Sequence, residues 1–383
     1  MPGEIQNRTQ VYLDNAATTP LCAAAQAAME PYLVGTFGNA SSPYAVSRNA
    51  RAAVDRARGQ VAALIGAQPD EIVFTSGGTE SDNWALLGTA LANWERRGHI
   101  LVSAVEHHAI LEPAETLRDL GFEVESIGVD ENGQVAPEAI EHLLRPNTIL
   151  VSVMAVNNEV GVCQPVAEIG ALLRERGITF HTDAVQAAGK LSVSVNELNV
   201  DLLSLSAHKF QGPKGVGALF IRRGVKMRAW QRGGAQERGR RAGTENVPGI
   251  VGMGVAAEIA HRNLSQNQTY LNSLRERLEQ GLKSLPGACI NGSSAPRAPH
   301  ITNVSLAGQR AESLALNLDL MGFAVGTGSA CASGALEPSH VLTAMGRSQS
   351  AARASLRVSL GVQNTVSDID NFLDAVKQVL QRN

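Results

Sequence analysis

Two residues, Asp183 and Lys209, have side chains that could act together on a bound cofactor. Each lies at or just beyond the end of a short apolar run, residues 178–181 and 202–206, of the kind that forms a buried strand. A lysine flanked by small or apolar residues can lose its proton and form a Schiff base. An aspartate at the end of a neighbouring strand can keep a pyridinium nitrogen protonated, so that the ring accepts electrons. The pair therefore indicates chemistry on a cofactor with a pyridine ring.

The alternative for Lys209 is a surface lysine in a turn, which is the commoner state of an isolated lysine. Lys214, in Gly212-Pro-Lys-Gly215, is the competing candidate. We favour Lys209 because it lies nearer a strand end, whereas a turn rich in proline and glycine presents its lysine to solvent.

A glycine-rich stretch, Ser76-Gly-Gly-Thr-Glu80, follows the strand expected at residues 71–75 and opens a helix expected at 79–96. Glycines let the backbone approach an anion, and a helix N-terminus offers free N–H groups and a positive dipole end. Gly78 and Thr79 could therefore bind a phosphate. The alternative is an ordinary glycine turn in which Thr79 caps the helix. The sequence has neither a Walker lysine pattern nor a complete dinucleotide motif.

Polar residues also follow the other predicted strands, at residues 100–105 and 149–156. Ligands of an open parallel sheet bind at the carboxyl ends of its strands, so we expect these side chains to converge on one edge. The polar residues that follow the four strands are Glu106, His107 and His108, then Asn157, Asn158 and Glu159, then His181, Thr182, Asp183 and Gln186, and finally Ser206, His208 and Lys209.

One of the four cysteines is a candidate reactive thiol. Cys331 lies in Gly326-Thr-Gly-Ser-Ala-Cys-Ala-Ser-Gly334, a run of small residues that is typical of a functional loop. Cys22 and Cys289 are expected to be buried packing residues, and Cys163 is a weaker candidate. No Cys-x-x-Cys pair is present, which argues against a disulfide framework or a structural zinc site.

Arg357 interrupts the alternating apolar segment 354–360. A fixed guanidinium suits the capture of a carboxylate through two hydrogen bonds. An exposed arginine on a half-buried strand explains the pattern equally well.

Apolar runs and helical patterns alternate through the middle of the chain, with helices expected at 46–65 and 166–176 as well. This alternation predicts an α/β fold with a mainly parallel sheet covered on both faces. After residue 251, amphipathic helices frame short strands, which predicts a smaller α+β domain. We expect a large domain over residues 16–262 and a small domain built from 1–15 and 263–383.

The composition of the 383 residues excludes several classes of protein. A hydrophobic fraction of 44% is enough for a sizeable core. The net charge of −3 gives no reason to expect nucleic acid or an anionic membrane as partner. No apolar run could span a bilayer and no signal pattern opens the sequence, so we expect a cytoplasmic protein.

Several of these stretches resemble the cysteine desulfurases of the NifS/IscS type, within the class V aminotransferases. The similarity runs from about Tyr12 nearly to the C-terminus, and the short loop around Cys331 resembles the IscS-like group. The similar segments are Tyr12-Leu-Asp-Asn-Ala-Ala-Thr-Thr-Pro20, Phe74-Thr-Ser-Gly-Gly-Thr-Glu-Ser81, Glu106-His107, Asn157-Asn-Glu-Val-Gly161, Phe180-His-Thr-Asp-Ala-Val-Gln186, Ser206-Ala-His-Lys209, Gly212-Pro-Lys-Gly215, Gly233-Gly-Ala-Gln-Glu-Arg-Gly239, Gly243-Thr-Glu-Asn246, Gly328-Ser-Ala-Cys331 and Leu336-Glu-Pro-Ser339.

The resemblance implies a homodimeric enzyme of pyridoxal 5'-phosphate (PLP) fold type I that converts L-cysteine to L-alanine. Its sulfur would pass as a persulfide on Cys331 to acceptor proteins such as an iron–sulfur scaffold, with tRNA thiolation and cofactor biosynthesis as other destinations. The resemblance implies Lys209 as the covalent cofactor lysine, His107 stacked on the ring and exchanging protons, Asp183 at the ring nitrogen, and Gln186 at the ring hydroxyl. It further implies that the phosphate is bound by Gly78, Thr79, Ser206 and His208, together with Thr244 of the other subunit. Asn158 and Arg357 would bind the substrate carboxylate, and Asn158 would also contact the cofactor.

Three positions depart from the family pattern. Gly78 stands where alanine is common, and Ala235 stands where glycine is common. Segment 38–44 lacks the proline that often follows its asparagine and the histidine often found near its end. These departures lie at the edge of the implied site, where they could affect substrate access.

Two other functions stay open at this point. A selenocysteine lyase or another PLP enzyme would share the fold, although the thiol of Cys331 favours sulfur transfer. A non-enzymatic scaffold that docks sulfur carriers would not need Lys209, Asp183 and Cys331 together.

Overall fold

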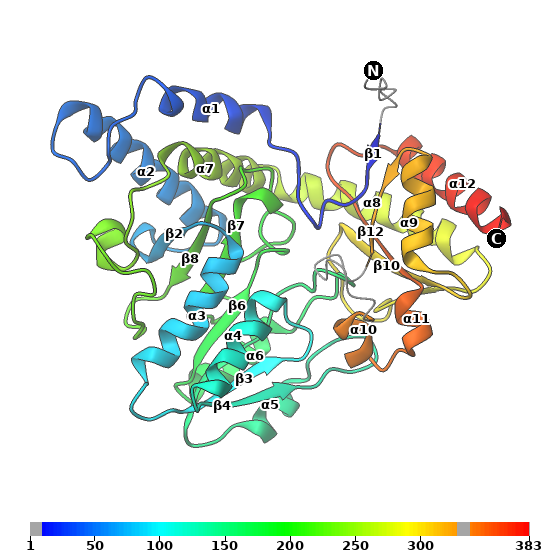
Figure 1. Cartoon of the computed structure of the whole chain (residues 1–383), viewed down its shortest axis with the longest axis horizontal. Helices are drawn as coiled ribbons and strands as arrows, with labels where there is room; N and C mark the ends of the chain where they lie inside the picture. The colour runs from blue at the N-terminus through cyan, green and yellow to red at the C-terminus, as the bar shows by residue number, and fades with distance from the viewer. Residues whose placement is uncertain (1–9, 328–337, 383) are drawn as a thin grey trace.

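The structure is a computed structural model that describes residues 10–327 and 338–382. A seven-stranded sheet forms the centre of the larger of two bodies (Figure 1). Its order is β2–β8–β7–β6–β5–β3–β4, with all pairings parallel except those of β8. The strands are β2 (Ile72–Thr75), β3 (His99–Ser103), β4 (Glu123–Ile127), β5 (Thr148–Ser152), β6 (Thr179–Asp183), β7 (Leu202–Ser206) and β8 (Gly217–Ile221).

Helices cover both faces of this sheet because successive strand residues point to opposite sides. Phe74 and Leu203 pack in the core under α2, α6 and α7, whereas their neighbours Val73 and Leu202 pack in the core under α3 and α4. This arrangement confirms the predicted α/β fold. The helices are α1 (Ala23–Leu33), α2 (Ala45–Leu64), α3 (Gly78–Ala92), α4 (His108–Asp119), α5 (Pro137–Leu143), α6 (Val166–Glu175) and α7 (Val247–Arg262).

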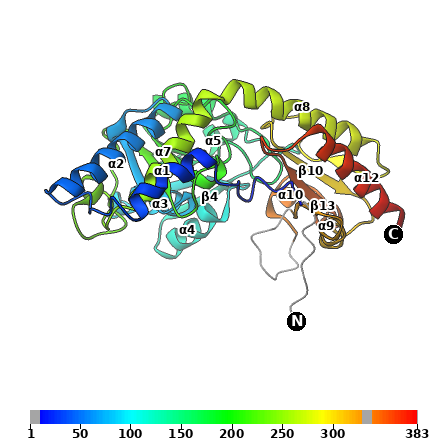
Figure 2. The same ribbon diagram turned by 90° about the horizontal axis from the view of Figure 1, so that it is seen from above.

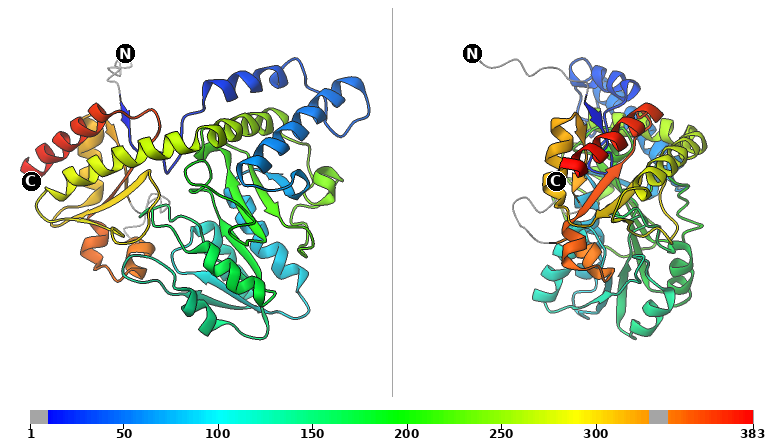
Figure 3. Two further views of the ribbon diagram at one scale, coloured as in Figure 1. Left: turned by 180° about the vertical axis from the view of Figure 1, so that it is seen from behind. Right: turned by 90° about the vertical axis from the view of Figure 1, so that its right-hand side faces the viewer.

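A smaller body carries an antiparallel sheet of order β12–β13–β10–β9, and Figures 2 and 3 show α8 extending from the end of α7 across it. The short strand β1 pairs with β11 here. The elements are β1 (Val11–Tyr12), α8 (Leu264–Lys283), β9 (Ala288–Ile290), β10 (Ile301–Leu306), α9 (Ala311–Leu320), β11 (Phe323–Ala324), β12 (Gly326–Thr327), α10 (His340–Ala344), α11 (Gln349–Arg353), β13 (Ser355–Ser359) and α12 (Val366–Arg382).

The main apolar cores of the two bodies are separate, and a small cluster in which Val105, Val160 and Val162 pack with Val341, Leu342 and Met345 joins them. Leu13 packs with residues of α8, β10, β13 and α12, and none of these belongs to the two cores of the large sheet. The separate cores support the division into residues 16–262 and the remainder, whose boundaries stay a prediction.

An ion pair between Arg58 of α2 and Glu237 ties the segment before α7 to the sheet. The two guanidinium–carboxylate distances are 2.7 and 2.8 Å, and Glu237 also accepts the N–H of Phe74. Both side chains are at least nine-tenths buried. The loop therefore keeps its shape although Glu237 and Arg238 both have left-handed backbone angles.

Replacing Glu237 by alanine is expected to lower the free energy of unfolding by about 3–5 kcal/mol, because the Arg58 charge stays buried without a partner. Urea unfolding followed by circular dichroism measures this loss. The matched control is Asp70→Ala, which removes the exposed partner of Arg223 and should change stability little. Equal effects of the two substitutions would show that the buried pair does not stabilise the fold.

Candidate active site

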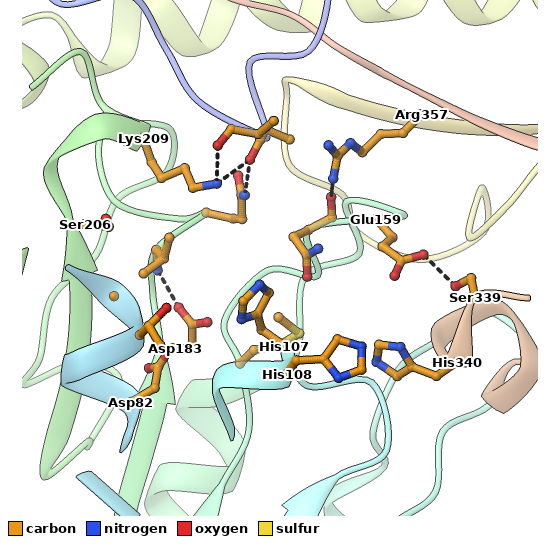
Figure 4. A pocket seen from close by; sticks show the side chains of 18 of the residues that line it. Asp82, His107, His108, Glu159, Asp183, Ser206, Lys209, Ser339, His340 and Arg357 are labelled. Carbon is orange, nitrogen blue, oxygen red and sulfur yellow. Dashed lines mark hydrogen bonds between the residues drawn. The ribbon is translucent and has the colours of Figure 1, made fainter. Parts of the chain in front are cut away.

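A cavity of about 430 Å³ lies between the two bodies, at the carboxyl ends of β6 and β7 (Figure 4). Residues of the large body line most of it, and Arg357 of β13 lines it from the smaller body together with Ser339 and His340. The structure brings together every described residue that the family resemblance assigned to one chain's own site. They are Gly78, Thr79, His107, Asn158, Asp183, Gln186, Ser206, His208, Lys209 and Arg357.

Lys209 reaches this cavity because a short 3-10 turn, Ala207–Lys209, follows β7 directly. Its Nζ donates to the carbonyl oxygens of Ala16 and Ala17, at 2.6 and 2.8 Å. The competing Lys214 is exposed and does not line the cavity. Of the two lysines, only Lys209 can therefore act on a ligand held there.

Asp183 ends β6 and is buried, with 6% of its surface exposed. Burial raises the pKa of Asp183 to about 6, while the Val185 N–H that its Oδ1 accepts and the Lys209 cation oppose the shift. A cation placed against Asp183 would stabilise its charged form.

His107 is the N-cap of α4, and its Nδ1 accepts the backbone N–H of Ala109 at 3.1 Å. Burial, followed by the nearby Lys209 cation, lowers the pKa of His107 to about 4. The ring is therefore neutral near pH 7. Because Nδ1 accepts a hydrogen bond, the single N–H proton of the neutral ring resides on Nε2.

The N-terminus of α3 forms one wall of the cavity, beside Ser206 and His208. Gly77 is the N-cap, so the alternative in which Thr79 caps the helix is wrong. A Cβ on Gly78 would lie 2.9 Å from Val185 Cγ2, which gives a reason for glycine where alanine is common. The free N–H groups of this fifteen-residue helix can receive an anion.

Gln186 and His208 are both held by contacts outside the cavity. Gln186 Nε2 donates to Ala16 O at 2.9 Å, and its Oε1 lies 3.3 Å from His300 Nε2. His208 Nδ1 lies 3.0 Å from the hydroxyl of Thr18. These contacts fix the orientation of both side chains before any ligand binds.

Arg357 is buried with 4% of its surface exposed, so the alternative of an exposed arginine is wrong. Its guanidinium bonds Asp14 Oδ1 at 2.8 Å and the carbonyl oxygen of Asn158 at 3.0 Å. Its Nε is buried without a hydrogen-bond partner among the described residues. These contacts hold a cation at the wall of the cavity, where it can meet a carboxylate.

Three further lining residues, Asp82, Ser339 and His340, were not expected from the sequence, whereas Glu159 was expected among the polar residues after the strand at 149–156. Burial raises the pKa of Glu159 to about 7, and its Oε2 accepts the Ser339 hydroxyl at 2.5 Å. His340 Nε2 lies 2.9 Å from the carbonyl oxygen of Glu106. Ser339 and His340 come from the other body and carry no local signal in the sequence.

The cysteines differ sharply in their surroundings. Cys331 lies outside the described residues. Burial raises the pKa of the half-buried Cys163 to about 11, which makes it a poor nucleophile near pH 7. The predicted burial of Cys289 is wrong, because it lies exposed on the edge strand β9, and Cys22 is only partly buried.

Comparison with known proteins assigns the family. The sequence profile described as Aminotransferase class-V matches residues 11–372. This chain belongs to the class-V aminotransferase family. The cysteine desulfurase IscS of Methanosarcina thermophila is 48% identical over 97% of this chain and 92% of its own length. That of Dictyoglomus turgidum is 46% identical over 98% and 95%. Within the family the chain therefore belongs with the cysteine desulfurases, and it is an enzyme.

Solved structures agree with this assignment. A NifS-like protein superposes on the enzyme with a TM-score of 0.92 at 39% identity, covering 98% of this chain and all of the other. The structure of SspA in complex with cysteine has a TM-score of 0.82 at 35% identity, covering 91% of this chain and 98% of the other. The predicted family and fold are confirmed, and membership implies dependence on PLP.

Proposed function

We propose that the enzyme uses PLP to convert L-cysteine to L-alanine and carries the released sulfur as a persulfide on Cys331. One observation supports this above all: Lys209, Asp183 and Arg357, from three separate elements, line one cavity. The names of the relatives and the cysteine held by SspA support the choice of substrate.

The residues of the cavity fit PLP at both ends of the molecule. At one end, the buried carboxyl of Asp183 needs a cationic partner, which a protonated pyridine ring supplies. At the other end, the N-terminus of α3 with Ser206 and His208 offers donors to a phosphate. His107, neutral and half-buried, lies where it can cover the ring. PLP supplies an electrophilic carbonyl and a ring that accepts electrons from the substrate.

Lys209 is proposed to hold the cofactor and then to move the substrate proton. With the substrate in the cavity, the Lys209 amine would take the proton from the substrate Cα. The carbonyl oxygens of Ala16 and Ala17 hold its Nζ at the cavity wall in the meantime. No other lysine lines the described part of the cavity.

Cys331 is proposed to receive the sulfur. Its thiolate attacks the substrate sulfur, an S–S bond forms, and the C–S bond breaks with its electron pair staying on the carbon skeleton, which becomes alanine after protonation. Nε2–H of His107 is the proposed site of proton exchange, because the ring is neutral and its Nδ1 is occupied. With an added thiol to reduce the persulfide and release its sulfur as sulfide, measuring alanine and sulfide in equal amounts tests this function. A transaminated keto acid as main product would contradict it, and higher activity on selenocysteine would favour a selenocysteine lyase.

Arg357 and Asn158 are proposed to bind the substrate carboxylate. Arg357→Lys is expected to raise KM for L-cysteine about 10- to 100-fold with a smaller change in kcat, because lysine cannot make two parallel hydrogen bonds while also contacting Asp14. Steady-state kinetics measure the effect. The matched control is Arg353→Lys, an exposed position on α11. An unchanged KM in the Arg357 variant would place the carboxylate elsewhere.

The enzyme is proposed to act as a homodimer in which Thr244 reaches the phosphate of the partner. Thr244 is exposed and does not line the cavity of its own chain. The connection between α1 and α2 and the segment before α7 also expose large apolar side chains, which is typical of an interface. They are Leu33, Val34, Phe37, Tyr44 and Trp230, each at least half exposed.

The sulfur is proposed to pass to acceptor proteins, with iron–sulfur assembly, tRNA thiolation and cofactor biosynthesis as candidate destinations. In the part of the chain that the structure describes, no helix is both long and apolar enough to cross a bilayer. The cytoplasmic location stays a prediction.

A further inference from the structure

Three carboxyl groups lie buried together beneath the cavity, although the proposed chemistry uses only one. Asp82, Glu106 and Asp183 have exposed fractions of 2%, 0% and 6%. Figure 4 shows Asp82 next to Asp183, and both line the cavity. Three charges this close in a desolvated site would repel one another strongly, so the site must decide which carboxyl is ionised.

Asp82 lies in the second turn of α3 and has polar neighbours from the sheet. Its Oδ1 has no hydrogen-bond partner among the described residues and lies 3.7 Å from His181 Nε2. The His181 ring is bonded on one side to the Ser152 hydroxyl at 2.9 Å and on the other to the Ser204 hydroxyl at 3.0 Å. Burial lowers the pKa of His181 to about 3, so this histidine supplies no positive charge to Asp82.

The charged and titratable groups around the three acids favour ionisation of Asp183. Burial and then the charge of Asp183, with a further contribution from Glu106, raise the pKa of Asp82 well above its usual range, against a contact from Ser204. Burial raises the pKa of Glu106 to about 8, although Ser103 and the Met154 N–H bond its Oε1. Asp183 is the only one of the three whose pKa a lysine, Lys209, lowers.

We propose that Asp82 is a positioning residue that acts through Asp183: it stays uncharged, so that the one negative charge of the three carboxyls resides on Asp183 beneath the cofactor ring. As a neutral polar group it also solvates the Asp183 carboxylate inside the fold. This inference rests on the proposed use of PLP, because the ring nitrogen is the reason for a single charge at Asp183.

Infrared spectroscopy of the holoenzyme at about pH 7 tests the protonation state directly. The spectrum is expected to contain carbonyl stretching bands of protonated carboxylic acids, and Asp82→Asn is expected to remove one of them. Glu106→Gln should remove a different band, so that the two variants together assign one band to Asp82 and one to Glu106. Retention of every protonated-acid band in Asp82→Asn would show that Asp82 is ionised and would overturn the proposal.

The proposed effect of Asp82 on Asp183 is tested by measuring the pH at which half of the bound cofactor is released. Asp82→Asn should leave this pH unchanged, because an amide reproduces an uncharged acid. If Asp82 were charged, the same variant would remove a like charge, lower the pKa of Asp183 and lower the release pH, which contradicts the proposal. Asp82→Leu should raise the release pH by about 0.5 unit or more, because Asp183 loses a polar neighbour and keeps its proton to higher pH.

Thr89→Val is the matched control for packing, since it alters a buried hydroxyl without a partner on the same helix. It should leave the release pH unchanged, and the thermal midpoints of all variants are measured beside it. A release pH that is the same in Asp82→Leu as in the wild type would show that Asp82 has no positioning role. A protein that binds no PLP would refute the proposed function, while the infrared bands of the apoprotein would still report on Asp82.

Discussion

Replacing Lys209 by alanine is expected to lower kcat/KM for L-cysteine by about a thousandfold or more, the upper part of the range for losing a general base. The variant loses both the covalent hold on the cofactor and the amine that takes the Cα proton. Lys209 Nζ donates to the main-chain carbonyl oxygens of Ala16 and Ala17 at the cavity wall, so the fold should persist without this side chain. Alanine production measured at saturating PLP gives the effect.

Lys214→Ala is the matched control, because Lys214 lies five residues further along the chain but is exposed. This variant should keep wild-type turnover, and borohydride reduction should still attach the cofactor covalently to Lys209. If Lys214→Ala lost activity and Lys209→Ala kept it, the choice between the two lysines would be wrong.

Replacing Cys331 by serine is expected to abolish desulfuration while the absorption of the bound cofactor is preserved. A serine hydroxyl is ionised far less than a thiol near pH 7 and cannot form a persulfide. The cofactor contacts proposed for Lys209, Asp183 and His107 do not involve residue 331. Absorption spectra and a sulfide assay on the same sample separate the two effects.

Cys163→Ser is the control for loss of a thiol. Burial raises the pKa of Cys163 to about 11, so this thiol is hardly ionised near pH 7 and its loss should leave turnover unchanged. Full desulfurase turnover in Cys331→Ser would refute Cys331 as the sulfur acceptor. Loss of turnover in Cys163→Ser would then indicate Cys163 as the acceptor.

The sequence predicts five of the seven strands of the large sheet, because buried parallel strands are short apolar runs, and it misses β4 and β8. The predicted strand at residues 202–206 coincides with β7, and the helix expected at 166–176 ends one residue earlier as α6. The strand expected at 149–156 ends at Ser152, although Val153 and Ala155 still donate to carbonyl oxygens of His181 and Asp183. Beyond Ser152 the chain thus keeps only alternate contacts with β6.

The strand-end rule also predicts the site residues of the large domain. Asp183 and Lys209 could be placed together because the carboxyl ends of neighbouring strands share an edge. Asp82 could not be found this way, since it lies inside a helix whose pattern gives no sign that one turn faces a ligand. Its function depends on packing between α3 and β6, which no local pattern encodes.

Contacts between the two bodies could not be predicted from the sequence either. Arg357 was expected either exposed or at the substrate, and only the fold places Asp14 and Asn158, from distant parts of the sequence, around its guanidinium. Cys289 was placed in the core by its apolar neighbours, but one face of an edge strand meets solvent.

The most direct test of sulfur transfer to Cys331 is the mass of the peptide that contains it, measured after brief incubation of the holoenzyme with L-cysteine and rapid alkylation. The account predicts that this peptide gains one sulfur atom, that the gain is lost on reduction, and that the Cys163 peptide is unchanged. Alanine formation without any sulfur on the Cys331 peptide, or with the sulfur on another cysteine, would contradict it.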